Sequence, residues 1–229
     1  MDTRVRLSKK EKMQVQEILD SQLLKEQEER KKAPSGKINP GRLGKCLRAQ
    51  WYYYTQAPES NPPDKLALRK FKRGNVFHKL VQDAILLEEP LAEAEFEVTT
   101  ADIHGFVDIL LPDETVEIKS VSHFGFQHLT KGDKTIGEQR PDWILQATCY
   151  AYNLDKDFMR IVIVNCESMQ IEEFYMKVTG ELAEKMCLEV ATINEMRMKN
   201  WEPDRQPRLY NGKECSYCNW KGLCDGDNN

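Results

Sequence analysis

The chain has 229 residues, of which 40% are apolar and 31% charged, with a formal net charge of −4. This length allows one well-buried domain of roughly 150 to 200 residues with an appendage, and the absence of an apolar run of roughly 18 residues argues against a membrane protein. The N-terminus shows no apolar signal segment, so we expect the reducing cytoplasm, where the seven cysteines serve as thiols or metal ligands rather than disulfides.

The first predicted element is a helix over residues 8–32. Ser8 and Glu11 fit a capping box, in which each side chain bonds the other residue's backbone amide. The segment APSGKINPG at residues 33–41 then breaks the chain. We therefore predict that residues 1–36 form an N-terminal helical arm.

Residues 37–229 are predicted to form one domain of helices and strands. The predicted helices cover residues 42–54, 65–87, 142–153 and 180–200. The predicted strands cover residues 93–99, 103–111, 115–120, 158–164 and 171–178. The glycine-bearing stretch 124–137 is predicted as a loop, and the residues from 205 to 225 as a Cys-rich end segment. This order favours an α/β or α+β fold with a central mixed sheet flanked by helices.

Basic residues are concentrated in residues 65–79, which hold six cations and no acid, and Arg42, Lys45 and Arg48 form a second group. Such a block can follow a phosphate backbone although the whole chain is acidic. A solvated helix face explains the charge run equally well. The candidate DNA-contacting residues are Arg69, Lys70, Lys72 and Arg73.

A hairpin turn at Pro112 and Asp113 would place Asp108 directly opposite Glu117. Lys119 then shares their face, because side-chain direction repeats every two residues along a strand. Two opposed carboxylates repel each other unless a cation lies between them, and hard oxygen ligands suit Mg²⁺ or Mn²⁺. The alternative is that these are surface residues of an exposed sheet face.

Two histidines are candidate further ligands. His78 lies on the basic helix, where it could reach the inner face or simply pack in the core, and His104 shares the predicted face of Asp108. We favour His78. On a later helix, Gln146 and Tyr150 are one turn apart and so present two polar groups on one side.

In chain order, RGNVFH (73–78), GFVD (105–108), EIK (117–119) and QATCY (146–150) resemble the signature of RecB-like nucleases of the PD-(D/E)xK superfamily. GFVD replaces the Pro-Asp of the superfamily name. The resemblance implies a restriction-endonuclease-like core that hydrolyses DNA with Mg²⁺ or Mn²⁺. The implied metal ligands are His78, Asp108, Glu117 and the carbonyl of Ile118. The implied catalytic residues are Asp108, Glu117, Lys119, Gln146 and Tyr150.

Cys46 and the C-x2-C-x5-C pattern of Cys215, Cys218 and Cys224 resemble the iron–sulfur staple of AddB-type and CRISPR-associated RecB-like nucleases. This resemblance implies a 4Fe–4S cluster that joins the two ends of the nuclease domain. The spacing alone also fits a four-cysteine zinc site.

The resemblance implies a metal-dependent DNA nuclease, and most of all an exonuclease, in DNA repair, recombination or CRISPR or phage DNA processing. Its substrate would be single-stranded DNA or the ends of double-stranded DNA. The sequence has no P-loop motif, so a helicase, recombinase or CRISPR adaptation protein is expected to act in trans. A homo-oligomer is an expected assembly. The alternative function is a non-catalytic module that binds DNA ends or a recombination partner.

Overall fold

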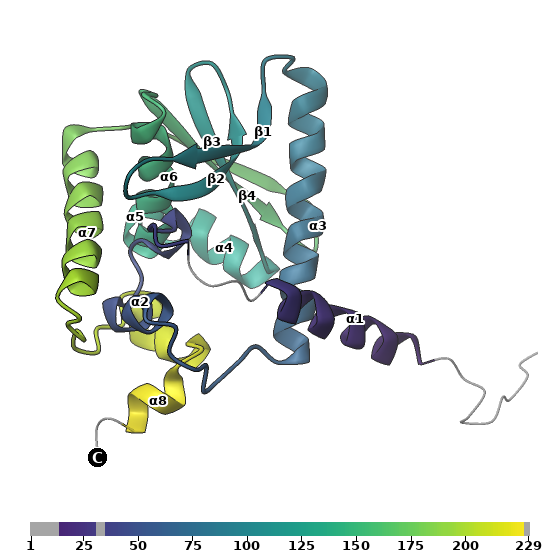
Figure 1. Cartoon of the computed structure of the whole chain (residues 1–229). Coiled ribbons are helices and arrows are strands. Elements are labelled where there is room, and N and C mark those ends of the chain that lie inside the picture. Colours follow the sequence, from purple (N-terminus) through teal and green to yellow (C-terminus); the bar gives the residue numbers. More distant parts are fainter. Residues whose placement is uncertain (1–13, 31–34, 227–229) are drawn as a thin grey trace, which may run out of the picture.

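The computed structural model describes residues 14–30 and 35–226. The capping box predicted at Ser8 and Glu11 lies outside these ranges. The predicted first helix is present as α1 (Val15–Arg30), which in Figure 1 crosses the lower end of α3 (Lys65–Glu88) and extends away from the body. Within the described ranges, no helix is both long and apolar enough to cross a membrane.

Most predicted elements are present with shifts of a few residues at their ends. The further helices are η1 (Pro40–Arg42), α2 (Leu47–Tyr54), α6 (Pro141–Asn153), α7 (Gly180–Met198), η2 (Tyr210–Tyr217) and α8 (Lys221–Gly226). The strands are β1 (Glu93–Thr99), β2 (His104–Leu110), β3 (Glu114–Val121), β4 (Phe158–Asn165) and β5 (Ile171–Lys177).

The five strands form one sheet in the order β1-β2-β3-β4-β5. β3 and β4 run parallel, and the other neighbours are antiparallel. The mixed sheet predicted from the sequence is therefore confirmed. β2 and β3 pair through Ile109 with Val116 and Leu110 with Thr115, which is the register that a turn centred on Pro112 and Asp113 predicts.

The two faces of the sheet carry separate apolar cores. Ile118 of β3 and Val162 of β4 pack with α3 on one face. Ile161 and Ile163 of β4 pack with α6 on the other face, as alternation along a strand requires. Helix α7 then packs against the outside of α6. Glu117 and Lys119 flank Ile118, so they leave the sheet on the α6 side.

The loop predicted for residues 124–137 is wrong, because this stretch contains α4 (His123–Lys131) and α5 (Ile136–Gln139). The side chain of Ser122 accepts a hydrogen bond from the amide of Gly125 and caps α4, and Thr135 forms a capping box with Glu138. These caps satisfy amides that the first turn of a helix leaves unpaired. Its glycines made the segment look irregular.

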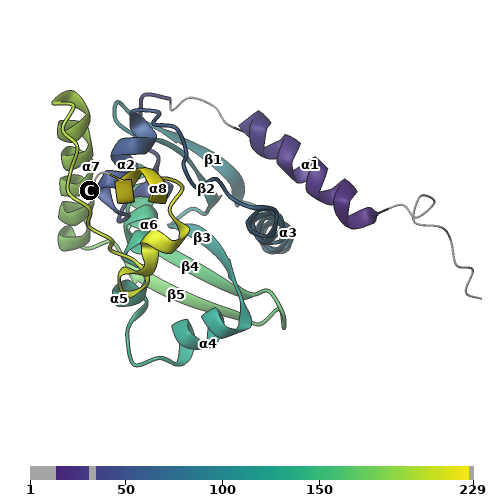
Figure 2. The ribbon, with the colours of Figure 1, turned by 90° about the horizontal axis from the view of Figure 1, so that it is seen from below.

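Segments far apart in the sequence lie side by side where α2 meets the C-terminal residues (Figures 1 and 2). Trp220 is buried against Tyr52, and its indole nitrogen donates to the carbonyl of Ala57 at 2.9 Å. The side chain of Asn61 donates to the carbonyl of Cys218 at 3.0 Å. These contacts bring the region of Cys46 next to the C-terminal cysteines.

Candidate active site

The candidate site lies where the pairing of β2 and β3 gives way to a side-chain contact. Oδ2 of Asp108 accepts a hydrogen bond from the backbone amide of Ile118 at 2.6 Å. The backbone carbonyl of Asp108 accepts another from the side chain of Gln82 on α3 at 2.9 Å. The buried backbone groups are thus satisfied by side chains, and the carboxyl of Asp108 is fixed between the two strands.

Glu117, Lys119 and Gln146 form one hydrogen-bonded group. Nζ of Lys119 donates to Oε1 of Glu117 at 2.6 Å and to Oε1 of Gln146 at 3.0 Å. Nε2 of Gln146 donates to the same Glu117 oxygen at 2.7 Å. The other oxygen of Glu117 is buried and has no hydrogen-bond partner, so it is free to bind a cation.

Burial controls the charge of both acids. It raises the pKa of Asp108 to about 6 and the pKa of Glu117 to about 7, and the proximity of Asp108 adds to the rise at Glu117. Lys119 opposes the rise at both carboxyls. Ionising two neighbouring buried carboxyls is unfavourable unless a cation offsets their charge, so such a pair is expected at a divalent-cation site.

His78 reaches the same place from α3, whereas His104 pairs with Glu97 at 3.2 Å. Nε2 of His78 lies 3.5 Å from Oδ1 of Asp108, is buried, and has no hydrogen-bond partner. Burial lowers the pKa of His78, which favours the neutral imidazole that binds metals. Sequence reasoning missed Glu95, whose Oε1 is also 3.5 Å from this nitrogen.

Among the described residues, His78, Glu95 and Asp108 make up the one group of three potential metal ligands whose ligand atoms lie within 4.8 Å of one another. The alternating pattern of β1 gave no sign that Glu95 differs from its neighbours. Its position depends on the fold rather than on a motif.

Tyr150 lies under this site on α6 and is 3% exposed. A Cβ atom on Gly105 would come within 2.7 Å of its hydroxyl, so only glycine fits the strand at this point. Burial raises the pKa of Tyr150, and its hydroxyl therefore stays protonated. The Tyr150 hydroxyl hydrogen-bonds with the side chain of Gln146 and lies against Gly105 of β2.

Two depressions meet beside the acids, and Lys119 and Phe71 line both. Lys70, Arg73 and His78 line the first. Arg42, Lys45 and Arg140 line the second, which extends toward Cys218 and Trp220. Burial lowers the pKa of Lys45 to about 8. Arg42 and Lys45 of the second basic group thus also border the site, whereas Arg48 lines the cavity of the four cysteines.

The four candidate DNA-contacting residues divide into two pairs. Lys70 and Arg73 line the first depression. Arg69 instead forms two 2.7 Å hydrogen bonds with Asp20 of α1, and Lys72 pairs with Glu26 of the same helix at 3.1 Å. Arg69 and Lys72 are therefore already paired with acidic residues of α1.

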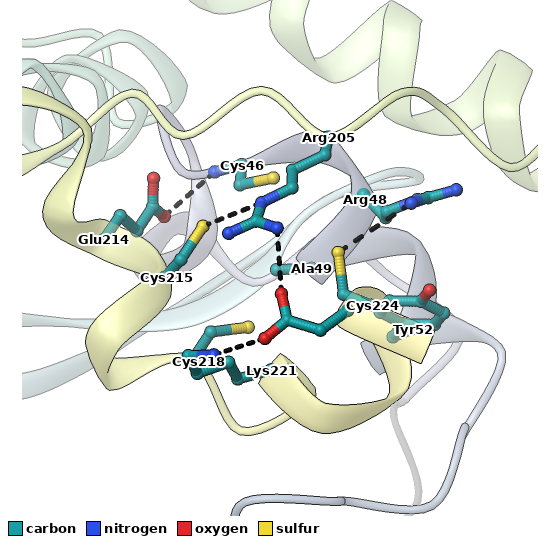
Figure 3. Close-up of a pocket in the computed structure, with 11 residues that line it drawn as sticks. Cys46, Arg48, Ala49, Tyr52, Arg205, Glu214, Cys215, Cys218, Lys221 and Cys224 are labelled. Carbon is teal, nitrogen blue, oxygen red and sulfur yellow. Dashed lines mark hydrogen bonds and ion pairs between the residues drawn. The ribbon is translucent and has the colours of Figure 1, made fainter. Parts of the chain in front are cut away.

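The four cysteines of the predicted cluster line one small cavity. Figure 3 shows Arg205 donating to the sulfur of Cys215 and Arg48 donating to that of Cys224. The backbone amide of Cys46 donates to Glu214 at 3.0 Å and ties this segment to the C-terminal one. In the described part of the chain, no three cysteine sulfurs lie within 4.8 Å of one another.

Solved structures show which proteins share this architecture. An alkaline exonuclease (LHK-Exo) from Laribacter hongkongensis matches with a TM-score of 0.52 and 15% identity, over 72% of this chain and 89% of that chain. A phage-related exonuclease from Haemophilus somnus 129PT matches with a TM-score of 0.54 and 13% identity, over 67% and 80%. This chain has the fold of these exonucleases.

The protein SSO0001 also shares the exonuclease-like fold, with a TM-score of 0.57 and 18% identity over 93% of this chain and 96% of that chain. No protein-family model and no curated protein sequence matches the chain. At these identities the likeness establishes the fold, and it confirms the nuclease-like architecture expected from the sequence.

Proposed function

We propose that this protein is a Mg²⁺- or Mn²⁺-dependent deoxyribonuclease, and specifically an exonuclease that acts in DNA repair, recombination or the processing of phage or CRISPR DNA. The observation that carries the proposal is the pair of buried acids Asp108 and Glu117, held beside Lys119 with one carboxylate oxygen left without a partner. The fold is shared with two proteins described as exonucleases.

Asp108, Glu117, His78 and the carbonyl of Ile118 are the proposed metal ligands. The unpartnered atoms Oε2 of Glu117 and Nε2 of His78 support this assignment, because buried polar atoms in proteins are nearly always satisfied. A bound divalent ion lowers the pKa of a coordinated water and offsets negative charge on a phosphate.

The polar groups around the acids have proposed roles in orienting the reactants. Lys119 is held by its bonds to Glu117 and Gln146 where the two depressions meet, so its ammonium can donate to a phosphate oxygen or an attacking water. Gln146 orients Lys119 and Glu117 through its two hydrogen bonds, and Tyr150 orients Gln146. Arg73 and Lys70 would bind phosphates on one side.

We also propose that Cys46, Cys215, Cys218 and Cys224 bind a 4Fe–4S cluster that joins the two ends of the nuclease domain. The four cysteines line one cavity beside α2, which supports the proposal, and donors from Arg48 and Arg205 can stabilise the negative charge of a cluster. Zinc remains the alternative.

Absorption and metal analysis test the cluster. Cys218→Ser should lose visible absorption and iron and should unfold at a lower temperature, because the metal closes a very long loop. Cys187→Ser is the control, since this thiol is exposed and does not line the cavity. A colourless wild-type protein with bound zinc would replace iron–sulfur with zinc.

The function is tested with end-labelled linear DNA and circular DNA, each single- and double-stranded, in Mn²⁺, Mg²⁺ or EDTA. Lys119→Ala should abolish cleavage while DNA binding, measured by fluorescence anisotropy, stays within about twofold of wild type. Lys185→Ala, which removes an exposed lysine on α7, should cut normally. Cleavage retained by Lys119→Ala would refute the site.

Circular DNA decides the mode of action, because an exonuclease needs an end and leaves circles intact. If metal-loaded protein binds DNA and cuts none of the substrates, the protein is a DNA-end-binding module on a nuclease fold. A helicase, recombinase or CRISPR adaptation protein is the proposed partner in trans, and light scattering would reveal a homo-oligomer.

A further inference from the structure

Helix α1 is acidic and rests on the basic end of α3. It holds five acids and two bases, whereas residues 65–73 at the start of α3 hold five bases and no acid. Figure 2 shows α1 on the side of α3 that faces away from β3 and β4. Among the helices and strands, α1 packs chiefly on α3. The contact between the two helices therefore joins surfaces of opposite charge.

Two ion pairs hold the helices together. Nε and Nη2 of Arg69 donate to the two oxygens of Asp20 at 2.7 Å each, which is the forked geometry with which arginine also binds phosphate. Nζ of Lys72 donates to the two oxygens of Glu26 at 3.2 and 3.1 Å. Each acid thus presents two oxygens to a cation, as a phosphate group does.

The apolar part of this contact is small. Leu23 of α1 is 5% exposed and lines a cleft with Phe71 of α3. Val15, Ile18 and Leu24 of the same helix stay 65%, 53% and 41% exposed. Because α1 buries few apolar side chains, its ion pairs contribute much of the attraction to α3. Salt weakens such pairs, and another anion can replace the carboxylates.

The surface under α1 is continuous with the candidate active site. Phe71 lines the cleft beside α1 and also both depressions that meet at Lys119. Lys70 and Arg73, which line the first depression, directly follow in sequence the two cations that α1 pairs with. A DNA strand whose phosphates bind Lys70 and Arg73 would therefore reach those two cations next.

We propose that α1 and the DNA backbone compete for the same surface of α3. In the free protein Asp20 and Glu26 hold Arg69 and Lys72, and a bound strand displaces α1 and takes both cations with its phosphates. The proposal rests on the proposed action on DNA and adds a built-in competitor to it. Since the full surface is open only in the fraction of molecules whose α1 has left α3, α1 lowers the apparent affinity for DNA by that fraction.

The full-length double variant Asp20→Asn, Glu26→Gln tests the proposal. Its binding to an end-labelled single-stranded oligonucleotide is measured by fluorescence anisotropy in EDTA, so that no strand is cut. It should bind at least about threefold more tightly than wild type. Its slope of log K against log salt should be steeper by up to about 1.4, because the two released cations then exchange counterions for phosphates, at about 0.7 for each phosphate of a single strand.

The matched control is the double variant Glu17→Gln, Glu29→Gln. It removes the same charge from two exposed acids of α1, so it reports any effect of net charge on DNA binding and should leave the affinity close to that of wild type. Circular dichroism confirms that each variant is folded.

Hydrogen exchange of wild type gives a second readout that needs no substitution. Amides of α1 should exchange faster in the DNA complex, because a displaced helix of this length is only marginally stable alone, whereas those of α6 should not. If the first double variant gains no more affinity than the control, or if α1 stays as protected with DNA as without it, the competition is refuted while the nuclease proposal stands. If neither wild type nor the variants bind DNA, both proposals are refuted.

Discussion

Glu117→Gln should stabilise the metal-free protein at alkaline pH. The substitution keeps the shape of the side chain. The amide oxygen can accept the hydrogen bonds that Oε1 of Glu117 now accepts from Lys119 and Gln146, and the NH₂ group takes the place of the unpartnered oxygen. What the variant removes is a buried negative charge.

The size of the effect follows from the pKa. Burial raises the pKa of Glu117 from 4.5 to about 7, which corresponds to about 3 kcal/mol between the folded and unfolded states. The folded protein holds the proton more tightly than the unfolded chain. The cost of ionisation is therefore small at pH 4, about 1.4 kcal/mol at pH 5.5 and nearly complete at pH 8, so wild-type stability falls as pH rises from about 4.5 to about 7.

Thermal unfolding in EDTA, at a fixed scan rate, measures this cost. At pH 8 the apparent Tm of Glu117→Gln should exceed that of wild type by roughly 6 to 12 °C. At pH 4, below the unfolded pKa, the two proteins should nearly coincide. Added Mn²⁺ should raise the Tm of wild type at pH 8 more than that of the variant. A variant that melts below wild type at pH 8 without metal would show that Lys119 already compensates the charge, and would refute the reasoning.

Two further substitutions test other parts of the site. Arg73→Ala should weaken DNA binding, measured by fluorescence anisotropy, and should lower the slope of log K against log salt by about one. Arg69→Ala should weaken binding much less. Equal losses of affinity would show that α1 does not hold Arg69. Gly105→Ala should lower the stability to urea by about 1 to 3 kcal/mol, because its Cβ meets the Tyr150 hydroxyl. Adding Tyr150→Phe should restore part of the loss, and a purely additive double mutant would contradict the clash.

Local chemistry made part of the site predictable. Turn residues set the register that faces Asp108 toward Glu117, and two-residue alternation then placed Lys119. Helical spacing likewise placed Gln146 above Tyr150. These placements depend only on neighbours in sequence or on one tight turn, so they can be predicted without knowing the fold.

The rest depended on contacts between distant segments. Arg69 and Arg73 are one helical turn apart, so helix phase could not show that α1 engages Arg69 and leaves Arg73 beside the site. Glu95 comes within 3.5 Å of His78 on α3 although it lies on β1, and its backbone is left-handed. The two-residue period of a strand predicts neither feature.

The carboxyl of Asp108 joins two strands, since one of its oxygens takes the position of a backbone acceptor for the amide of Ile118. Evolutionary loss of cutting would therefore not free this position to vary. A descendant that kept the fold as a DNA-binding platform could lose Glu117 and Lys119 together, but it would still need an acceptor opposite Ile118. Asparagine or aspartate should persist there long after the chemistry has gone, so an intact acid at this position alone would be poor evidence of an active enzyme.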